Sequence, residues 1–193
     1  GILPTLDRVT HGWTDGDTAN LSIGQGELSV TPLQMAVAYA AIANGGTVFW
    51  PRLVARIEPQ NSNGSGKLIT YPAGMARDKI TVAPRNMQIL HSAMLAETQE
   101  GTGQAAQVAG LQICGKTGTA QVMDEHNREV GVTTWFASFA PYENPRYSVI
   151  VMVEKEGRDY GGTICAPIAH DIYEEILRQE KSGTVHTLAT ATP

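Results

Sequence analysis

The sequence predicts an α+β domain in which helices pack against an antiparallel sheet. Two runs with helical start and stop signals lie within residues 31–101. Three extended runs joined by polar or Pro-containing turns follow, and then a final amphipathic helix. At 193 residues, with 42% hydrophobic and 17% charged residues, the chain is long enough for one domain with a sizeable core.

The opening of the chain, through Asp17, is rich in turn residues and is expected to be irregular. A helix is then predicted from Thr31, which can cap it, with Pro32 at the first helical position and Gln34 completing a capping box. Small and apolar residues follow on nearly every face, so we expect this helix to be buried. The Asn-Gly-Gly sequence at residues 44–46 is a strong helix end.

Two short extended runs, Leu53–Ile57 and Lys67–Tyr71, predict a hairpin. The Asn-, Ser- and Gly-rich residues 61–66 between them predict a mobile loop. A second helix is expected to begin near Pro84, where apolar residues recur at helical spacing, and to end by Gly101.

The second half of the chain predicts three antiparallel strands followed by a helix. The strands are expected at Leu111–Met123, Thr133–Ala140 and Tyr147–Glu154. The helix is expected to begin near Pro167 and to carry an apolar stripe that packs on the sheet. The stripe consists of Ile168, Ile172, Tyr173, Ile176 and Leu177.

Net charge and hydropathy indicate what these 193 residues are expected to bind or span. With 14 basic and 19 acidic residues the net charge is -5, which argues against a nucleic-acid partner. The sequence contains no apolar run long enough to span a bilayer and does not open with a secretory signal.

Cysteine and histidine residues give no support for a disulfide framework or a metal site. Cys114 and Cys165 lack C-x-x-C spacing and are interpreted as two small buried apolar side chains. The five histidines are scattered without metal-ligand spacing. Of these, His126 is expected in a solvated hairpin loop, and His170 on the surface of the last helix rather than acting as a base. We expect neither a metal nor a cofactor.

One short run fits two unrelated motifs. Residues Gly110–Thr117 match G-x-x-x-x-G-K-S/T, the phosphate-binding loop of nucleotide hydrolases. The overlapping Lys116-Thr117-Gly118 matches K-T-G, a signature of serine enzymes that react with penicillin.

The surroundings of the run favour the second motif. A phosphate loop needs a buried strand before Gly110 and a helix that begins at Lys116. Small and polar residues precede Gly110, and a Gly with two Thr residues follows Lys116, which favours an extended chain. One feature supports nucleotide binding, since the apolar run Val149–Glu154 ends in a carboxylate that could attend a magnesium ion.

Several further segments, in order along the chain, extend the K-T-G match. Gly16–Gly26 reads Gly-Asp-Thr-Ala-Asn-Leu-Ser-Ile-Gly-Gln-Gly and closely resembles the transpeptidase domain of penicillin-binding proteins. The other matching segments are Val30–Ala36, Ala43–Gly46, Glu100–Gly103, Gly115–Gln121, Trp135–Pro141, Gly161-Gly162 and Ala166-Pro167. The amino-acid sequence of the first segment is most similar to that of the class B, elongation-type penicillin-binding protein 2.

This resemblance implies a fold and a reaction. The fold would be the C-terminal part of the penicillin-binding protein and serine β-lactamase-like transpeptidase fold, an antiparallel sheet packed by helices. The reaction would be acyl transfer on peptidoglycan, in which a Ser attacks the carbonyl between two D-alanines of a stem peptide. The resulting acyl-enzyme passes its acyl group to an amine of a neighbouring strand, and β-lactams are trapped at the acyl-enzyme stage.

The same resemblance assigns roles to four residues. Lys116 and Thr119 are the expected catalytic residues, and Thr117, Gly118 and Thr119 are the expected substrate-binding residues. The positive charge of Lys116 would attract the terminal carboxylate of the substrate and set proton positions. The Thr117 and Thr119 hydroxyls would hold that carboxylate, and the Thr119 N–H would contribute to an oxyanion hole. Gly118 would leave room for a substrate added as a β-strand.

Each of these residues also has a purely structural explanation. A Lys such as Lys116 on an edge strand discourages aggregation, and Thr117 and Thr119 alternate as in any half-exposed strand. Trp135 and Phe136 are expected to be core and strand-pairing residues without a catalytic role. Only the ordered resemblance places the K-T-G residues in a site.

The sequence also departs from the family pattern. No Ser has Lys three positions later or Asn two positions later, so S-x-x-K and S-x-N are both missing from the chain. The family places these motifs upstream of the Gly-Gln-Gly segment, so we expect them before Gly1. Residues 1–181 are therefore expected to be the C-terminal part of a single transpeptidase domain, inactive alone, and residues 182–193 a disordered tail.

Partners and location are implied only by the resemblance. The expected partners are peptidoglycan stem peptides, β-lactams, the upstream part of the same protein and proteins of the cell-elongation complex. The expected location is the bacterial envelope, on the periplasmic or extracytoplasmic face of the inner membrane, with an N-terminal anchor. Two alternatives stay open, a nucleotide-binding protein that uses Gly110–Thr117 and a non-catalytic β-lactam sensor or scaffold of the same fold.

Overall fold

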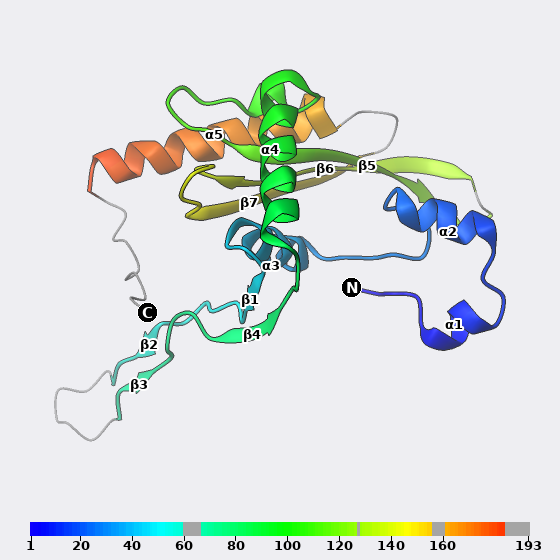
Figure 1. Ribbon diagram of the computed structural model, residues 1–193, viewed down its shortest axis with the longest axis horizontal. Coiled ribbons are helices and arrows are strands. Elements are labelled where there is room, and N and C mark those ends of the chain that lie inside the picture. The colour runs from blue at the N-terminus through cyan, green and yellow to red at the C-terminus, as the bar shows by residue number, and fades with distance from the viewer. Residues whose placement is uncertain (60–66, 127, 156–160, 184–193) are drawn as a thin grey trace.

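A computed structural model describes residues 1–59, 67–126, 128–155 and 161–183 (Figure 1). Its central element is a three-stranded antiparallel sheet in the order β5-β6-β7. The strands are β5 (Cys114–Met123), β6 (Glu129–Ala140) and β7 (Tyr147–Lys155). The three predicted strands are confirmed, although β5 begins three residues after the expected Leu111 and β6 four residues before the expected Thr133. The extra residues pair with the end of β5, where Gln121 lies opposite Val132.

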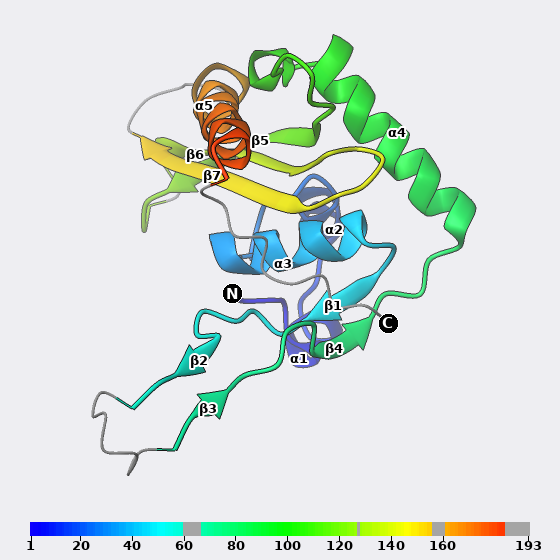
Figure 2. The ribbon, with the colours of Figure 1, turned by 90° about the vertical axis from the view of Figure 1, so that its left-hand side faces the viewer.

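Two helices cover the two faces of this sheet. Helix α5 (Gly161–Lys181) lies on one face and α3 (Pro32–Ala43) lies on the other (Figure 2). The main core lies between α5 and the sheet, where Phe136 and Tyr173 are fully buried. The Tyr173 hydroxyl lies 3.0 Å from Ser138 Oγ, which itself donates to the Val149 carbonyl at 2.9 Å.

The prediction that the last helix begins near Pro167 was wrong, because Pro167 lies inside α5. The helix starts earlier because the residues just before Pro167 bury against the sheet. Cys165 and Ala166 are fully buried, and the Cys165 thiol donates to the Thr134 carbonyl at 3.3 Å. This contact stabilises a helical turn that proline alone would not predict.

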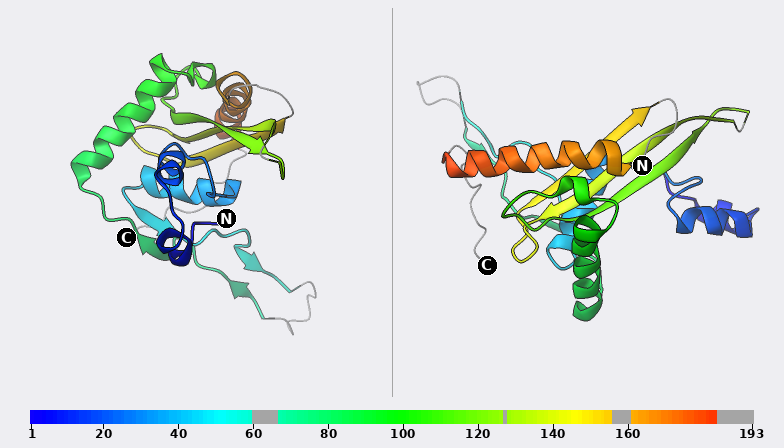
Figure 3. Two further views of the ribbon diagram at one scale, coloured as in Figure 1. Left: turned by 90° about the vertical axis from the view of Figure 1, so that its right-hand side faces the viewer. Right: turned by 90° about the horizontal axis from the view of Figure 1, so that it is seen from above.

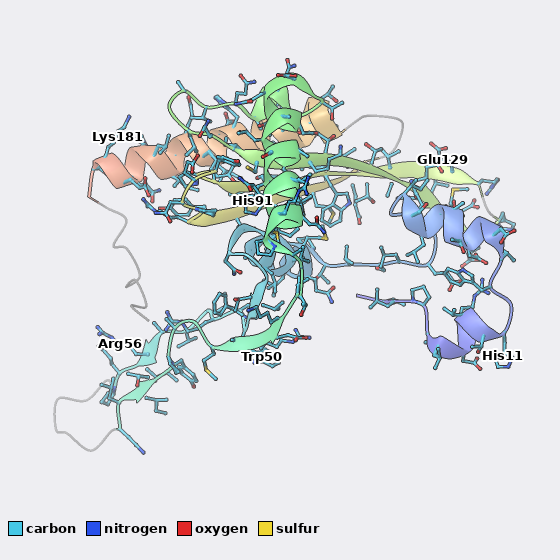
Figure 4. The ribbon with its side chains drawn as sticks, in the orientation of Figure 1. His11, Trp50, Arg56, His91, Glu129 and Lys181 are labelled. Carbon is cyan, nitrogen blue, oxygen red and sulfur yellow. The ribbon has the colours of Figure 1, made fainter. Side chains whose placement is uncertain are left out.

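Helix α4 (Pro84–Glu100) runs past the end of the sheet beside β5 and is followed by the short helix η1 (Gln104–Ala106). A second core cluster forms here from Met94, Cys114 and Phe139. His91 points from α4 towards α3 (Figure 4), where its Nε2 lies 2.8 Å from the Ile42 carbonyl oxygen. Both the predicted α3 and α4 are therefore confirmed.

The expectation of an irregular opening was wrong, because two short helices form there. They are α1 (Leu6–Thr10) and α2 (Asp15–Ser22), which lie together on one side of the molecule (Figure 3). Thr14 accepts a hydrogen bond from the Asp17 N–H at 3.2 Å, and the Asp17 carboxylate accepts from the Thr14 N–H at 2.8 Å. This reciprocal capping box starts α2 despite the Gly and Asp residues that suggested turns.

Two small strand pairs complete the fold. The predicted hairpin forms from β2 (Arg56–Ile57) and β3 (Ile69–Thr70), although its strands are only two residues long. A second pair, β1 (Thr47–Phe49) with β4 (Ala76–Lys79), was not predicted. The predicted mobile loop 61–66 lies outside the described residues, as does most of the predicted tail 182–193.

The remaining predictions concern single residues. Cys114 and Cys165 are both free and buried, as expected. His126 is exposed in the turn between β5 and β6, which confirms its assignment. His170 is not simply a surface residue, because its Nδ1 lies 2.6 Å from the Gln107 carbonyl oxygen and so ties α5 to the chain after η1. Among the helices described here, none has the length and apolar character needed to cross a membrane.

Candidate active site along the open edge of β5

Strand β5 forms one edge of the three-stranded sheet and carries the K-T-G run. The Thr117 N–H donates to Glu97 Oε1 of α4 at 3.1 Å, so it points away from β6. In an antiparallel pair, residues two positions apart present their backbone groups to the same side. Thr119 therefore also directs its N–H and carbonyl towards the edge of β5 that faces away from β6.

Lys116 lies on the opposite face of the strand from its neighbour Thr117, but its amino group turns towards the same edge. Its Nζ donates to the Thr117 carbonyl oxygen at 3.1 Å and to Thr117 Oγ1 at 3.3 Å. The side chain is 59% exposed and its Nζ is 3.6 Å from Glu97 Oε1. A positive charge is therefore held at the edge while staying open to a further anion.

Thr117 is engaged with the protein rather than directed into solvent. Its hydroxyl donates to Glu97 Oε1 at 3.1 Å and lies 2.6 Å from the Thr102 hydroxyl. Thr102 in turn donates to the same Glu97 oxygen at 2.9 Å. The role of the Thr117 hydroxyl in holding a substrate carboxylate stays a prediction, whereas Thr119 is exposed on the strand.

The two glycines of the run differ in what surrounds them. A Cβ on Gly118 would meet the Trp135 Cβ at 3.4 Å, an ordinary contact, so packing alone does not require glycine there. A Cβ on Gly115 would lie 2.5 Å from Cζ of the fully buried Phe136. Gly115 is thus required by packing, and Gly118 is the glycine whose absent side chain is compatible with a ligand role. Phe136 is a core residue, as predicted, and Trp135 is half-buried.

The Gly-Gln-Gly segment reaches β5 from the N-terminal part of the chain. Gln25 Nε2 donates to the Thr119 carbonyl oxygen at 3.4 Å. Gly24 and Gly26 on either side have φ values of 73° and 81°, which favour glycine. A cavity of about 650 Å³ lies between this segment and the far end of the sheet, lined in part by Trp135 and Met152. This cavity does not include the Lys116–Thr119 run itself.

The geometry does not fit the phosphate-loop alternative. Gly110 lies in a turn with φ 79°, where the Leu111 N–H donates to the Val108 carbonyl, and no helix begins at Lys116. Lys116 instead lies inside a ten-residue strand. The apolar run Val149–Glu154 lies within β7, which β6 separates from β5. The amides that would cradle phosphates at a helix start are therefore not placed at this lysine.

Glu97 is a residue at this edge that the sequence analysis missed. Its side chain is only 11% exposed, and its Oε2 is buried without a hydrogen-bond partner in the described part of the chain. The sequence did contain one indication that Glu97 is buried. It lies three positions after Met94 and next to Thr98, and both of those residues are on the buried face of α4. Nothing in the sequence alone linked that glutamate to the K-T-G strand 20 residues later.

Two neighbouring groups have raised pKa values. Burial raises the pKa of the Cys114 thiol to about 12, so this cysteine beside the K-T-G run is neutral and is not a nucleophile at neutral pH. Burial, with a smaller contribution from the charge of Glu97, raises the pKa of Tyr39 to about 12. Both side chains pack in the core cluster that contains Met94 and Phe139.

The chain is similar to known proteins in sequence and in fold. The chain is 31% identical to the peptidoglycan D,D-transpeptidase MrdA of Haemophilus influenzae over 89% of its length. It superimposes with a TM-score of 0.74 and 30% identity on penicillin-binding protein 3 of Mycobacterium tuberculosis in complex with ampicillin, with the whole chain covered. It also matches an imipenem acyl-enzyme complex of penicillin-binding protein A from M. tuberculosis, with a TM-score of 0.66, 28% identity and 82% of the chain covered.

The chain spans only part of each of these proteins, 27% of MrdA and 43% and 33% of the two solved chains. The match to the family described as the penicillin binding protein transpeptidase domain covers residues 7–174. The family predicted from the ordered motifs is thereby confirmed, as is the α+β fold class. The chain belongs to the transpeptidase domain family of the penicillin-binding proteins.

Proposed function

We propose that this chain contributes the K-T-G strand of the active site of a peptidoglycan D,D-transpeptidase that is acylated by β-lactams. The observation that carries the proposal is the edge of β5 that faces away from β6, where the Thr119 backbone and the Lys116 amino group lie on the same side. Membership of the transpeptidase family supports the same reaction. An exposed strand edge next to a fixed positive charge suits an extended peptide that ends in a carboxylate.

The residues on this edge have distinct roles in the proposed reaction. The stem peptide adds to β5 as a strand, and Gly118 leaves room for it. The Lys116 ammonium attracts the terminal carboxylate, with the Thr117 and Thr119 hydroxyls beside it. The Thr119 N–H stabilises the oxyanion that develops when a Ser Oγ attacks the carbonyl between the two D-alanines.

The covalent steps follow the chemistry of acyl transfer. A Ser–Oγ to carbonyl bond forms and the amide bond to the terminal D-alanine breaks, so the amine of that D-alanine leaves with a proton. The acyl group then passes to an amine on a neighbouring peptide, and the Ser hydroxyl is restored. A β-lactam reacts in the first step only, because its opened ring stays attached and keeps the acyl-enzyme from reacting further.

The nucleophile in this proposal comes from outside the 193 residues. None of their Ser residues is in an S-x-x-K sequence, and the curated relative MrdA is several times longer than the matched region. The remaining proposed partners are the upstream part of the same protein and proteins of the cell-elongation complex. The proposed location is the extracytoplasmic face of the inner membrane, as an elongation-type, class B enzyme.

Labelling with a fluorescent penicillin tests the proposal. The 193-residue chain should form no covalent adduct, whereas a longer protein that includes the upstream segment should be labelled on a Ser of that segment. A labelled Ser within the 193 residues would contradict the placement of the nucleophile. A longer protein that is labelled but does not cross-link stem peptides would be a sensor of the same fold, and one that is never labelled would be a scaffold.

A further inference from the structure

We propose that Glu97 is a positioning residue for the acyl-transfer site, because its carboxylate is hydrogen-bonded to Thr117 at the edge of β5. The predicted effect of Glu97 on the reaction rests on the proposed function. The hydrogen bonds between Glu97 and Thr117 are a property of the fold and do not depend on it.

A backbone N–H and two hydroxyl groups converge on one oxygen of this carboxylate. Glu97 Oε1 accepts from the Thr117 N–H at 3.1 Å, and the Thr117 and Thr102 hydroxyl oxygens lie 3.1 Å and 2.9 Å from it and 2.6 Å from each other. The Lys116 ammonium lies 3.6 Å from the same oxygen. Hydrogen bonds to an ionised acceptor are about twice as strong as neutral ones, and low exposure strengthens them further.

These bonds occupy the backbone edge that an added strand would otherwise use at Thr117. In an isolated edge strand, the Thr117 N–H would be open to water or to a partner strand. Glu97 accepts from this N–H, so an added strand cannot pair with β5 there. The Thr119 N–H lies two residues further along the same side, where a small shift of the strand would move the proposed oxyanion donor.

The surroundings of Glu97 keep its carboxylate in place. The residue lies on α4, next to the fully packed Thr98, whose hydroxyl donates to the Ile113 carbonyl just before β5. A Cβ on Gly103 would collide with Glu97 Oε2, so the glycine leaves room for the second oxygen. The acceptor therefore has a defined position relative to the strand.

Glu97→Met and Glu97→Gln form the matched pair that tests this role. Both side chains have nearly the length of glutamate, but only the amide of glutamine keeps an oxygen acceptor. Glu100→Met, at an exposed position on the same helix, controls for a new methionine on α4.

Amide hydrogen exchange on the 193-residue chain measures the hydrogen bond from the Thr117 N–H to Glu97 directly. Glu97→Met should speed exchange of the Thr117 amide by at least about tenfold relative to the buried Phe136 amide, while Glu97→Gln should stay within about threefold of the unsubstituted chain. Comparison with Phe136 separates a local loss from general destabilisation. Unchanged protection of Thr117 in Glu97→Met would overturn the proposal.

Acylation of the longer protein by a fluorescent penicillin measures the consequence. The labelled amplitude reports the folded fraction, and the acylation rate constant at saturating penicillin reports positioning. Glu97→Met should lower that rate constant at least about tenfold at full amplitude, with most of the rate restored in Glu97→Gln. A rate equal to that of the unsubstituted protein in Glu97→Met would contradict the positioning role, even if Thr117 loses protection.

The two measurements also separate this inference from the proposed function. If the unsubstituted longer protein is not acylated at all, the proposed function is wrong. Loss of Thr117 protection in Glu97→Met would in that case still support Glu97 as the residue that holds this strand edge.

Discussion

Replacement of Gly115 by alanine should destabilise the fold strongly, although this glycine is part of the motif that suggests chemistry. The added Cβ would lie 2.5 Å from Phe136 Cζ, 2.9 Å from Phe136 Cε2 and 3.2 Å from Thr98 Cγ2. Ordinary contacts of this kind are about 3.4 Å or longer, so the Phe136 ring or the strand must move by roughly 1 Å. Phe136 and Thr98 are both buried and have little space to move into.

Overpacking of a core typically costs about 1–3 kcal/mol, and the two close ring contacts place Gly115→Ala near the top of that range. For a domain of this size, a loss of about 3 kcal/mol lowers Tm by roughly 10 °C. Urea denaturation followed by circular dichroism measures the free energy of unfolding, and thermal melts measure Tm.

Gly118→Ala is the matched control on the same strand. Its Cβ would meet Trp135 only at 3.4 Å, so the free energy of unfolding should change by less than about 1 kcal/mol, in either direction. Equal stabilities for the two alanine variants would refute the assignment of Gly115 to packing and of Gly118 to the ligand side.

Three further predictions follow from the contacts around the sheet. The free energy of unfolding should fall as pH rises from about 9 towards 12, because burial raises the folded-state pKa of Cys114 to about 12 and only the unfolded chain can ionise readily. Ionisation of this thiol lowers the free energy of unfolding by at most about 1.4 kcal/mol per pH unit. Urea titrations at several pH values should show that Cys114→Ala removes this contribution to the pH dependence. Tyr173→Phe should cost about 1 kcal/mol in the same assay, because Ser138 loses a buried hydrogen-bond donor, and an unchanged stability would show that the bond contributes nothing. Gln25→Ala removes the 3.4 Å hydrogen bond to the Thr119 carbonyl, so it should slow acylation of the longer protein a few-fold while Tm stays within about 2 °C, and a large loss of Tm would assign Gln25 to folding instead.

Much of the fold could be predicted from local signals. Thr31, Pro32 and Gln34 together specify the start of α3, and the structure forms that capping box with Gln34 Oε1 accepting from the Thr31 N–H at 3.0 Å. The three strands of the sheet follow from apolar alternation and turn residues. Helices α1 and α2 were missed because Gly and Asp residues suggested turns, whereas the Thr14–Asp17 capping box provides helix-starting contacts.

Long-range contacts explain most of what the sequence could not predict. The start of α5 before Pro167 depends on burial of Cys165 beneath Thr134, a contact between residues 31 positions apart. Pairing of β1 with β4 similarly joins distant segments, and its strands are too short to show alternation.

Part of the candidate site could likewise be predicted from the sequence, and part could not. The K-T-G run and the other matching segments, in their order along the chain, were enough to predict the family from the sequence. The hydrogen bonds between Thr117 and Glu97, and the different packing around Gly115 and Gly118, depend on side chains from α4 and β6. Such neighbours have no fixed spacing from the motif, so only the folded chain shows them.

The most direct test of the central claim is the rate of acylation of the longer protein by a fluorescent penicillin, compared between the unsubstituted protein and Lys116→Ala. Loss of the ammonium at the β5 edge should reduce the rate at least about a hundredfold, because charge stabilisation of this kind typically contributes that much or more. Lys79→Ala, which removes an exposed lysine on β4, should leave the rate unchanged. Acylation of Lys116→Ala at the rate of the unsubstituted protein would contradict the assignment of the β5 edge to the active site.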